Sequence, residues 1–183
     1  MSKPFIEHYT YDDYCKWKGD WELIDGIPYA MAPSPMKTHQ SIAYEIAFRL
    51  REKLEESECK ECEVLGEIDY KINSDTVLRP DVVLTCGETH ERYLTKAPEI
   101  IFEVISTSTA KRDEEYKYEI YEDEGVKYYC LAYPDDLKVK IYNLKDAKYI
   151  KVGDFTTQKY RFKDIECEVE IDFSKVFKKY LNR

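Results

Sequence analysis

The spacing of hydrophobic positions changes several times along this chain, and each change predicts a different element. Alternating residues over 21–24 and 27–31 flank Asp25-Gly26, which predicts a β-hairpin with a type I′ turn. Over 38–57 the spacing becomes that of a helix with one apolar face. The residues of this apolar face recur at every fourth position and are Ile42, Ile46, Leu50 and Leu54.

The middle of the chain predicts three strands at the centre of a sheet. They cover residues 64–72, 77–85 and 99–106. The last is almost wholly apolar, which is typical of a strand buried on both faces. Ser106 to Thr109 then offer N-cap side chains for a helix over 110–124, and Gly125 is placed to end it.

Both ends of the chain add smaller elements. Thr10 and Asp13 resemble a capping box that opens a helix over 11–18. A hairpin is predicted over 126–142 around Pro134-Asp135-Asp136, strands over 148–152 and 160–162 are expected to extend its sheet, and a helix over 173–181 is expected to close the chain. Helices and strands in this order predict an α+β fold, with a mixed β-sheet core flanked by helices, an N-terminal β-hairpin and a β-rich C-terminal extension.

Length and composition favour one globular domain over residues 1–183. The chain is 43% hydrophobic and 36% charged, with only 6 Gly and 7 Pro, which excludes collagen-like and wholly disordered proteins. No apolar run approaches the roughly 18 residues of a membrane helix, and the first residues lack the apolar stretch of a signal peptide. A cytoplasmic protein without a membrane partner is therefore expected.

The net charge of −9 disfavours sequence-independent binding to nucleic acid. Residues 138–163, however, carry a local net charge of +6. We interpret this segment, including Lys138, Lys140, Lys148 and Lys151, as a candidate surface for weak and salt-sensitive DNA binding. The alternative is an ordinary solvated strand face.

Six cysteines are present, and two of them form the motif Cys59-Lys60-Glu61-Cys62. With no second pair and no histidine nearby, the motif cannot assemble a four-ligand zinc site locally. Nothing else indicates secretion, where disulfides are common. Reduced, partly buried cysteines are expected.

Two acids and a lysine stand where charge is unusual. Asp81 opens one apolar strand, Glu103 interrupts another, and Lys117 lies one helix later. A buried carboxylate is costly unless it is paired or binds a cation, and two such carboxylates can hold Mg²⁺ or Mn²⁺. The alternative is a core ion pair of Glu103 with Lys117 or Arg79.

Five short motifs follow one another along the chain. They are Glu22-Leu23-Ile24-Asp25-Gly26, the Ser-Pro-x-x-x-His element ending in His39, Arg79-Pro80-Asp81-Val82-Val83, the segment from Pro98 to Thr109, and Arg112-Asp113 to Lys117 with Tyr121 and Gly125-Val126. Together they resemble the PD-(D/E)XK nuclease superfamily, and within it the Uma-two family of restriction-endonuclease-like proteins. The resemblance covers about residues 11–142.

The resemblance implies a Mg²⁺- or Mn²⁺-dependent DNA endonuclease, commonly a homodimer. Asp81 and Glu103 match its metal-binding and catalytic acids, Glu22 matches an additional metal ligand, and His39 matches a position near the site. The superfamily usually has a lysine two residues after the second acid, where this chain has Ile105. In the branch that this chain resembles, the lysine lies on the following helix, and there it matches Lys117.

Several alternatives stay open at this point. Lys111 is a rival for the lysine but lies too near the helix start, and Thr107 replaces the usual proline after Ser106. Asp113, Glu114 and Glu115 are interpreted as partners of the helix dipole rather than as ligands. A non-catalytic nuclease-fold module that binds protein or nucleic acid, and a phosphodiesterase for small nucleotides, are the alternative functions.

Overall fold

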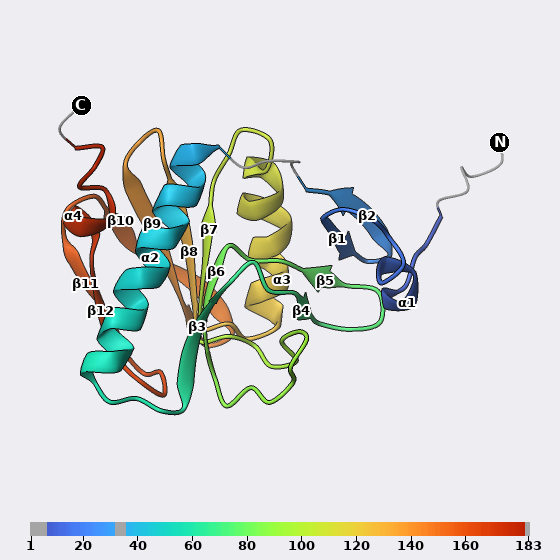
Figure 1. Cartoon of the computed structure of the whole chain (residues 1–183), viewed down its shortest axis with the longest axis horizontal. Helices are drawn as coiled ribbons and strands as arrows, with labels where there is room; N and C mark the ends of the chain where they lie inside the picture. The colour runs from blue at the N-terminus through green and yellow to red at the C-terminus, as the bar shows by residue number, and fades with distance from the viewer. Residues whose placement is uncertain (1–6, 32–35, 182–183) are drawn as a thin grey trace.

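A six-stranded sheet forms the centre of the molecule (Figure 1). The computed structural model describes residues 7–31 and 36–181. In sheet order, the strands are β10 (Lys148–Phe155), β9 (Lys138–Lys145), β8 (Tyr128–Tyr133), β7 (Ile100–Val104), β6 (Val82–Cys86) and β3 (Cys62–Gly66). Neighbouring strands are antiparallel except β7 and β8. A parallel pair needs a crossover, which is a helix made of a π-helical run, η1 (Arg112–Lys117), and α3 (Tyr118–Asp123).

The long helix α2 (Lys37–Glu56) covers one face of this sheet, which confirms the helix predicted over 38–57 (Figure 1). All four residues of its predicted apolar stripe are buried. They pack in one cluster with residues of β6, β7, β8 and β9. Burying a side chain of this size contributes roughly 1.5–3 kcal/mol, so the stripe alone fixes how α2 lies on the sheet.

The crossover helix and a second sheet lie on the other face. Tyr121 of α3 packs in one cluster with Val83, Ile101 and Tyr129 of the central sheet. The second sheet has the order β2 (Ile27–Ala30), β1 (Trp21–Ile24), β5 (Val77–Leu78) and β4 (Tyr70–Lys71). Its hairpin turn is the predicted type I′, because Asp25 and Gly26 both have positive φ, 48° and 74°.

Two of the predicted central strands are each divided between the two sheets. The segment 64–72 forms β3 and β4, and the segment 77–85 forms β5 and β6. The second break falls at Arg79-Pro80-Asp81, where Pro80 has no N–H to donate and the Arg79 N–H donates to the Glu22 carboxylate instead of to a strand. The first break therefore carries the chain from the central sheet into the second sheet, and the second break returns it to the central sheet beside Glu22.

The short terminal elements differ from their predictions in length or partner. α1 covers only Tyr11–Tyr14, although Thr10 and Asp13 form the predicted capping box. α4 covers only Phe173–Val176. The strand predicted over 160–162 is β11 (Lys159–Phe162), but it does not extend the central sheet. It pairs with β12 (Val169–Asp172), which the sequence analysis missed, in a separate two-stranded sheet.

The expectation of reduced cysteines is wrong for four of the six. Cys59 is bonded to Cys167, and Cys62 to Cys86, at sequence separations of 108 and 24. Cys62 and Cys86 oppose each other on β3 and β6, a proximity that no local spacing reveals. No helix in the described part of the chain is long and apolar enough to cross a membrane.

Candidate functional site

The two predicted acids of the site lie next to each other across the central sheet. Val82 of β6 pairs with Phe102 of β7, so Asp81 and Glu103 are the next opposed residues of these antiparallel strands. The Asp81 Oδ2 accepts a hydrogen bond from the Val104 N–H at 2.6 Å, which ties this side chain to β7. Opposed residues of an antiparallel pair leave the sheet on the same face, so both acids belong to one region.

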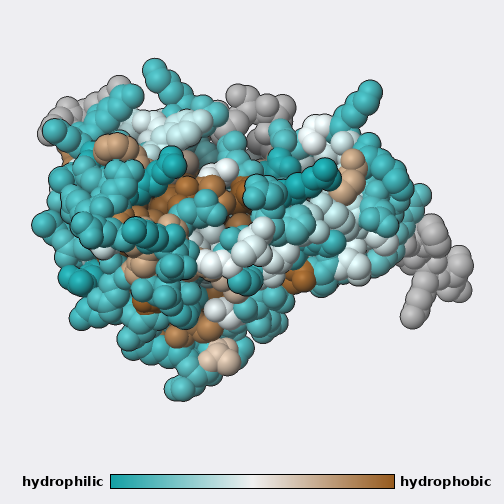
Figure 2. All heavy atoms as spheres, turned by 60° about the horizontal axis from the view of Figure 1, so that its bottom comes forward, coloured by the Kyte–Doolittle hydropathy of each residue, from teal (hydrophilic) through white to brown (hydrophobic). Residues whose placement is uncertain are grey.

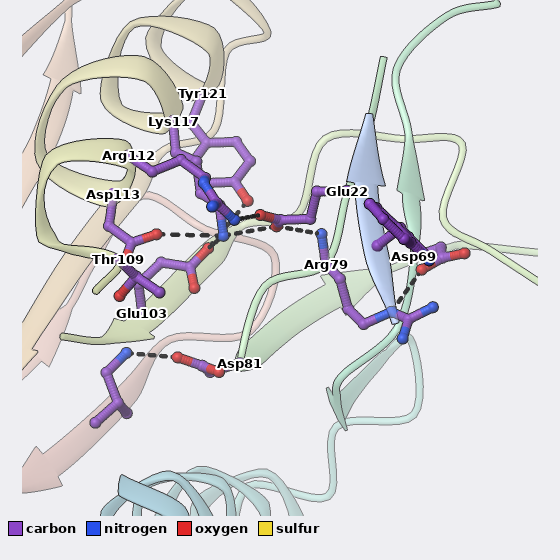
Figure 3. Close-up of polar contacts among 12 residues, drawn as sticks. Glu22, Asp69, Arg79, Asp81, Glu103, Thr109, Arg112, Asp113, Lys117 and Tyr121 are labelled. Carbon is purple, nitrogen blue, oxygen red and sulfur yellow. Dashed lines mark hydrogen bonds and ion pairs between the residues drawn. The ribbon is translucent and has the colours of Figure 1, made fainter. Parts of the chain in front are cut away.

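Lys117 lies at the centre of a buried charge cluster (Figure 3). Its Nζ is 2.7 Å from Glu22 Oε1, 3.0 Å from Glu103 Oε1 and 3.3 Å from Asp113 Oδ1. These four side chains are at most 4% exposed. Lys117 therefore joins β1, β7 and its own helix, and it matches the predicted lysine far better than Lys111, which is exposed.

Further hydrogen bonds hold the acids of this cluster in place. Glu22 accepts from the Arg79 N–H at 3.0 Å and from the Arg112 guanidinium at 3.1 Å. Glu103 Oε1 accepts from the Tyr121 hydroxyl at 3.1 Å. The Arg79 side chain points away from the cluster, toward Asp69 at 2.7 Å (Figure 3). Of the two ion pairs considered for Glu103, the one with Lys117 exists and the one with Arg79 does not.

Burial and charge shift the cluster's pKa values in opposite directions. The pKa of Glu103 lies well above its ordinary value, mainly because the side chain is buried. The Lys117 ammonium lowers this pKa, but the nearby acids Asp113, Asp81 and Glu22 raise it further. Burial also raises the pKa of Asp113. For Glu22, burial is outweighed by Lys117 and by the hydrogen bonds from Arg79 and Arg112, so its pKa is lowered. Burial disfavours the Lys117 cation, but Glu103, Glu22 and Asp113 hold the Lys117 pKa well above normal.

Asp81 lies at the open side of the region, beside His39. The His39 Nε2 is 3.3 Å from Asp81 Oδ2, and the Nδ1 of the same ring is buried without a hydrogen-bond partner in the described structure. Burial opposes the charged imidazole, but Asp81 outweighs it and raises the His39 pKa. A pocket of about 220 Å³ opens here, between the start of α2 and the strands β3 and β6, and its lining includes His39, Gly66, Glu67 and Asp81. The Ser34-Pro35 part of the His39 motif lies outside the described residues.

The acids of the region outnumber its permanent cations. Four acids (Glu22, Asp81, Glu103 and Asp113) face two permanent cations, Lys117 and Arg112, and the titratable His39. Full ionisation of the acids therefore leaves one negative charge in excess when His39 is protonated and two when it is neutral. A divalent cation compensates this excess, and carboxylate oxygens are the ligands that Mg²⁺ and Mn²⁺ prefer. Within the described chain, however, the site has no three acid or imidazole side chains with ligand atoms all within 4.8 Å of one another. Lys117 occupies the space between Glu22 and Glu103, so these acids need a side-chain movement to share an ion with Asp81.

Two residues of the cluster were misjudged or missed in the sequence. Asp113 was interpreted as a helix-dipole partner, but it is 3% exposed and ion-paired to Lys117. Its signal is the i,i+4 spacing to Lys117, which places both on one helix face. Arg112 belongs to one of the five motifs but has no predicted role, and its contact with Glu22 spans 90 positions of sequence.

The lysines of the basic segment 138–163 are less available for DNA contact than the net charge of the segment suggests. Lys138 pairs with Asp136 at 2.8 Å, Lys148 with Glu122 at 2.6 Å, and Lys151 with Asp154 at 3.0 Å. Lys140 instead donates to the Tyr133 hydroxyl at 3.1 Å.

The fold and the acid–lysine cluster together define a protein of the restriction-endonuclease-like class. A family model described as "Putative restriction endonuclease" matches residues 9–162, so the chain belongs to the Uma2 (Uma-two) family. The resemblance proposed from the sequence is thereby confirmed.

A solved structure shows the same fold. It is described as a putative nuclease belonging to DUF820 from Anabaena variabilis ATCC 29413. It aligns with a TM-score of 0.71 and 15% identity, over 92% of this chain and 97% of that chain. Comparison with curated proteins gave no match. Family and fold together support a nuclease function.

Proposed function

We propose that this chain is a divalent-metal-dependent endonuclease that hydrolyses phosphodiester bonds of DNA. The observation that carries the proposal is the buried excess of carboxylates around Lys117, directly beside the pocket that exposes Asp81. Burying such an excess without compensation is costly, so the arrangement is better explained by a cation than by stability alone.

Asp81, Glu103 and Glu22 are the residues proposed to hold the cation. When bound, the cation supplies charge that neutralises a scissile phosphate and lowers the pKa of a water. Asp81 presents its carboxylate at the pocket, while Tyr121 and Lys117 orient Glu103 behind it. The Lys117 ammonium places a permanent positive charge next to these acids, where it stabilises negative charge that develops on the phosphate.

His39 is proposed as a positioning residue for Asp81. Its Nε2 contacts the Asp81 carboxylate, and its unpartnered Nδ1 can serve a further hydrogen bond when substrate or water enters the pocket.

Cleavage of supercoiled DNA in Mg²⁺ or Mn²⁺ tests the proposal. Asp81→Asn and Glu103→Gln keep the shape of the side chains but remove their charge, so activity should fall by at least about 100-fold. Asp12→Asn changes an exposed acid of α1, outside the acid cluster and the proposed DNA-binding lysines, and serves as the matched control with full activity. Equal cleavage by all four proteins would identify a contaminating nuclease and refute the assignment.

For DNA contact we propose the face that carries Lys140. Glu103, Leu131 and Lys140 are opposed residues on three consecutive strands, so Lys140 lies in the same row as Glu103, roughly 10 Å away. Reversing Lys140 together with Lys138, Lys148 and Lys151 should weaken DNA binding and reduce its salt dependence. Unchanged affinity would refute this placement. The homodimer and the cytoplasmic location stay predictions, and sedimentation with and without DNA tests the first.

One observation favours a second candidate, a non-catalytic nuclease-fold module. The Lys117 ion pairs already satisfy Glu22 and Glu103 in part and close them from solvent. Calorimetry with Mn²⁺ separates the two functions. Binding that Asp81→Asn abolishes supports the enzyme, whereas no Asp81-dependent binding supports the module.

A further inference from the structure

Four of the six cysteines gather at one end of the molecule, although they come from three distant parts of the sequence. The Sγ atoms of Cys59, Cys62 and Cys167 all lie within 4.8 Å of one another. Cys86 is bonded to Cys62, so its sulfur lies directly beside this group of three, although it is not within 4.8 Å of every member. In the described part of the chain, no other set of three cysteine, histidine or acid side chains is this close. The other two cysteines lie elsewhere, Cys15 exposed and Cys130 in the core.

Four separate segments supply these sulfurs. Cys59 follows α2, Cys62 begins β3, Cys86 ends β6, and Cys167 precedes β12. The α2–β3 and β11–β12 connections lie together at the bottom of Figure 1. The backbone brings β3 and β6 together independently of the sulfurs, because the Gly87 N–H donates to the Glu61 carbonyl at 2.9 Å. The fold itself therefore holds Cys62 opposite Cys86, at the place where Cys59 and Cys167 also meet.

This arrangement has the chemistry of a tetrahedral zinc site. Zinc bound by four cysteines has Zn–S distances of about 2.3 Å, which places the sulfurs about 3.8 Å apart. Two disulfides of one protein need not lie together, but here three of the four sulfurs lie within 4.8 Å of one another and the fourth is bonded to one of the three. Cys59 and Cys62 also have the C-x-x-C spacing common in such sites, and neither is bonded to the other. The fold supplies the second pair of ligands that the local sequence lacks.

The surroundings favour a cation and leave it a way in. All four cysteines are only partly buried, and their sequence neighbours include five exposed acids, Glu58, Glu61, Glu63, Glu166 and Glu168. Figure 2 brings this end of the molecule forward and shows hydrophilic atoms around a band of hydrophobic ones. Negative charge around the thiols attracts Zn²⁺ and disfavours thiolates that have no cation beside them.

We propose that the reduced chain binds one Zn²⁺ through the thiolates of Cys59, Cys62, Cys86 and Cys167, which we call the cysteine cluster. Each disulfide takes two electrons and two protons from a dithiol reductant, which is oxidised to its own disulfide. Zn²⁺ then replaces the thiol protons, which go to solvent. The cluster joins the end of α2 and the β11–β12 sheet to the edge of the central sheet, so metal binding stabilises the same contacts that the disulfides hold when oxidised.

The wild-type chain itself provides the first test. The protein is fully reduced, its thiols are counted, and Zn²⁺ or Co²⁺ is added without oxygen. One metal ion per reduced chain is expected, with the sulfur-to-cobalt charge-transfer absorption of tetrahedral thiolate coordination. The oxidised chain should show no such absorption. A reduced chain with native circular dichroism and no thiolate-bound Co²⁺ overturns the proposal. So does a reduced chain that unfolds and is not restored by Zn²⁺.

Matched variants then locate the ion. Cys62→Ser and Cys86→Ser each remove one ligand and should weaken Zn²⁺ binding by at least about 100-fold. Cys15→Ser removes an exposed cysteine outside the cluster and should bind as the wild type does. Asp81→Asn should also leave the thiolate–Co²⁺ spectrum unchanged, which separates this ion from one held by the acids. An unchanged spectrum in both ligand variants overturns the assignment.

Discussion

Replacing Lys117 with methionine tests whether one ammonium holds the acid cluster together. Lys117→Met keeps the length of the side chain but leaves Glu22, Glu103 and Asp113 buried without their shared cation. At an effective dielectric constant of about 20, one charge pair 3 Å apart is worth about 5 kcal/mol before desolvation is counted. Lys117 makes three such contacts, at 2.7, 3.0 and 3.3 Å, with a single ammonium group. Because the three ion pairs share the desolvation cost of that group, their interaction energies cannot be added together.

Breaking a buried ion pair by removing one partner typically costs about 3–5 kcal/mol. We expect a loss of this size in the free energy of unfolding at pH 7, a large share of the roughly 5–15 kcal/mol of a typical domain. Urea unfolding followed by circular dichroism measures it. Lys127→Met removes a half-exposed lysine that pairs with Glu99, and this control should stay within about 1 kcal/mol of wild type.

The sign of the pH dependence gives a second check. In Lys117→Met the buried carboxyls lose their cation, so the raised pKa values of Glu103 and Asp113 rise further above those of the unfolded chain, and the pKa of Glu22 loses its main lowering cause. The folded variant then binds more protons than the unfolded one, and its stability increases as pH falls. The difference from wild type should therefore shrink between pH 7 and pH 5. Adding Glu103→Gln should recover at least about 1 kcal/mol, because it removes one uncompensated charge. A variant within 1 kcal/mol of wild type at pH 7, or a cost that does not change with pH, would refute this account of the cluster.

Three further predictions concern the rest of the fold. Burial tends to raise the pKa of Glu88, but hydrogen bonds from nearby backbone N–H groups outweigh it and lower this pKa to about 2. After discounting for partial exposure, Glu88→Gln should therefore cost about 1–2 kcal/mol at pH 7. Because this contribution is present above the unfolded pKa and is lost as pH falls toward 2, urea unfolding at pH 7 and pH 3 should show the cost shrinking, and a constant cost would contradict it. Leu50→Ala opens a cavity under α2 and should cost about 3 kcal/mol in urea unfolding, while a cost below 1 kcal/mol would mean that α2 does not anchor the core. Gly26→Ala forces a side chain into positive φ and against the His8 ring, so its melting temperature should fall by several degrees; an unchanged temperature would show that the turn relaxes.

Elements set by local chemistry were predictable from the sequence. α2 was found because its apolar residues repeat at helical spacing, and the β1–β2 turn because Asp25-Gly26 tolerates positive φ at both positions. The acids were found for a similar reason, since a charge inside an apolar strand is visible without any structure. Glu103 is the clearest case.

What the sequence analysis missed depends on contacts between distant segments. Cys59 meets Cys167 only because the β11–β12 sheet folds back against the end of α2. The segments 64–72 and 77–85 have continuous strand patterns, and only the competition between two sheets divides them. Asp113 was misjudged because an acid in the first turn of a helix is normally solvated, and only the folded chain, in which Tyr129 of β8 donates to its carbonyl oxygen, shows that it is buried.

The π-helical run η1 explains how one helix serves the acids from both sheets. In an α-helix, residues four apart share a face, and residues five apart do not. A π-helix bonds i to i+5, which aligns residues five positions apart. Arg112 and Lys117 are such a pair, and both reach Glu22, at 3.1 and 2.7 Å. The widened turn thus places a second cation on Glu22 while Lys117 still contacts Glu103. The cation that pairs with Glu103 is the Lys117 ammonium, which comes from the helix and not from the strand. Ile105, two residues after Glu103, is therefore free to pack in the hydrophobic cluster under α3.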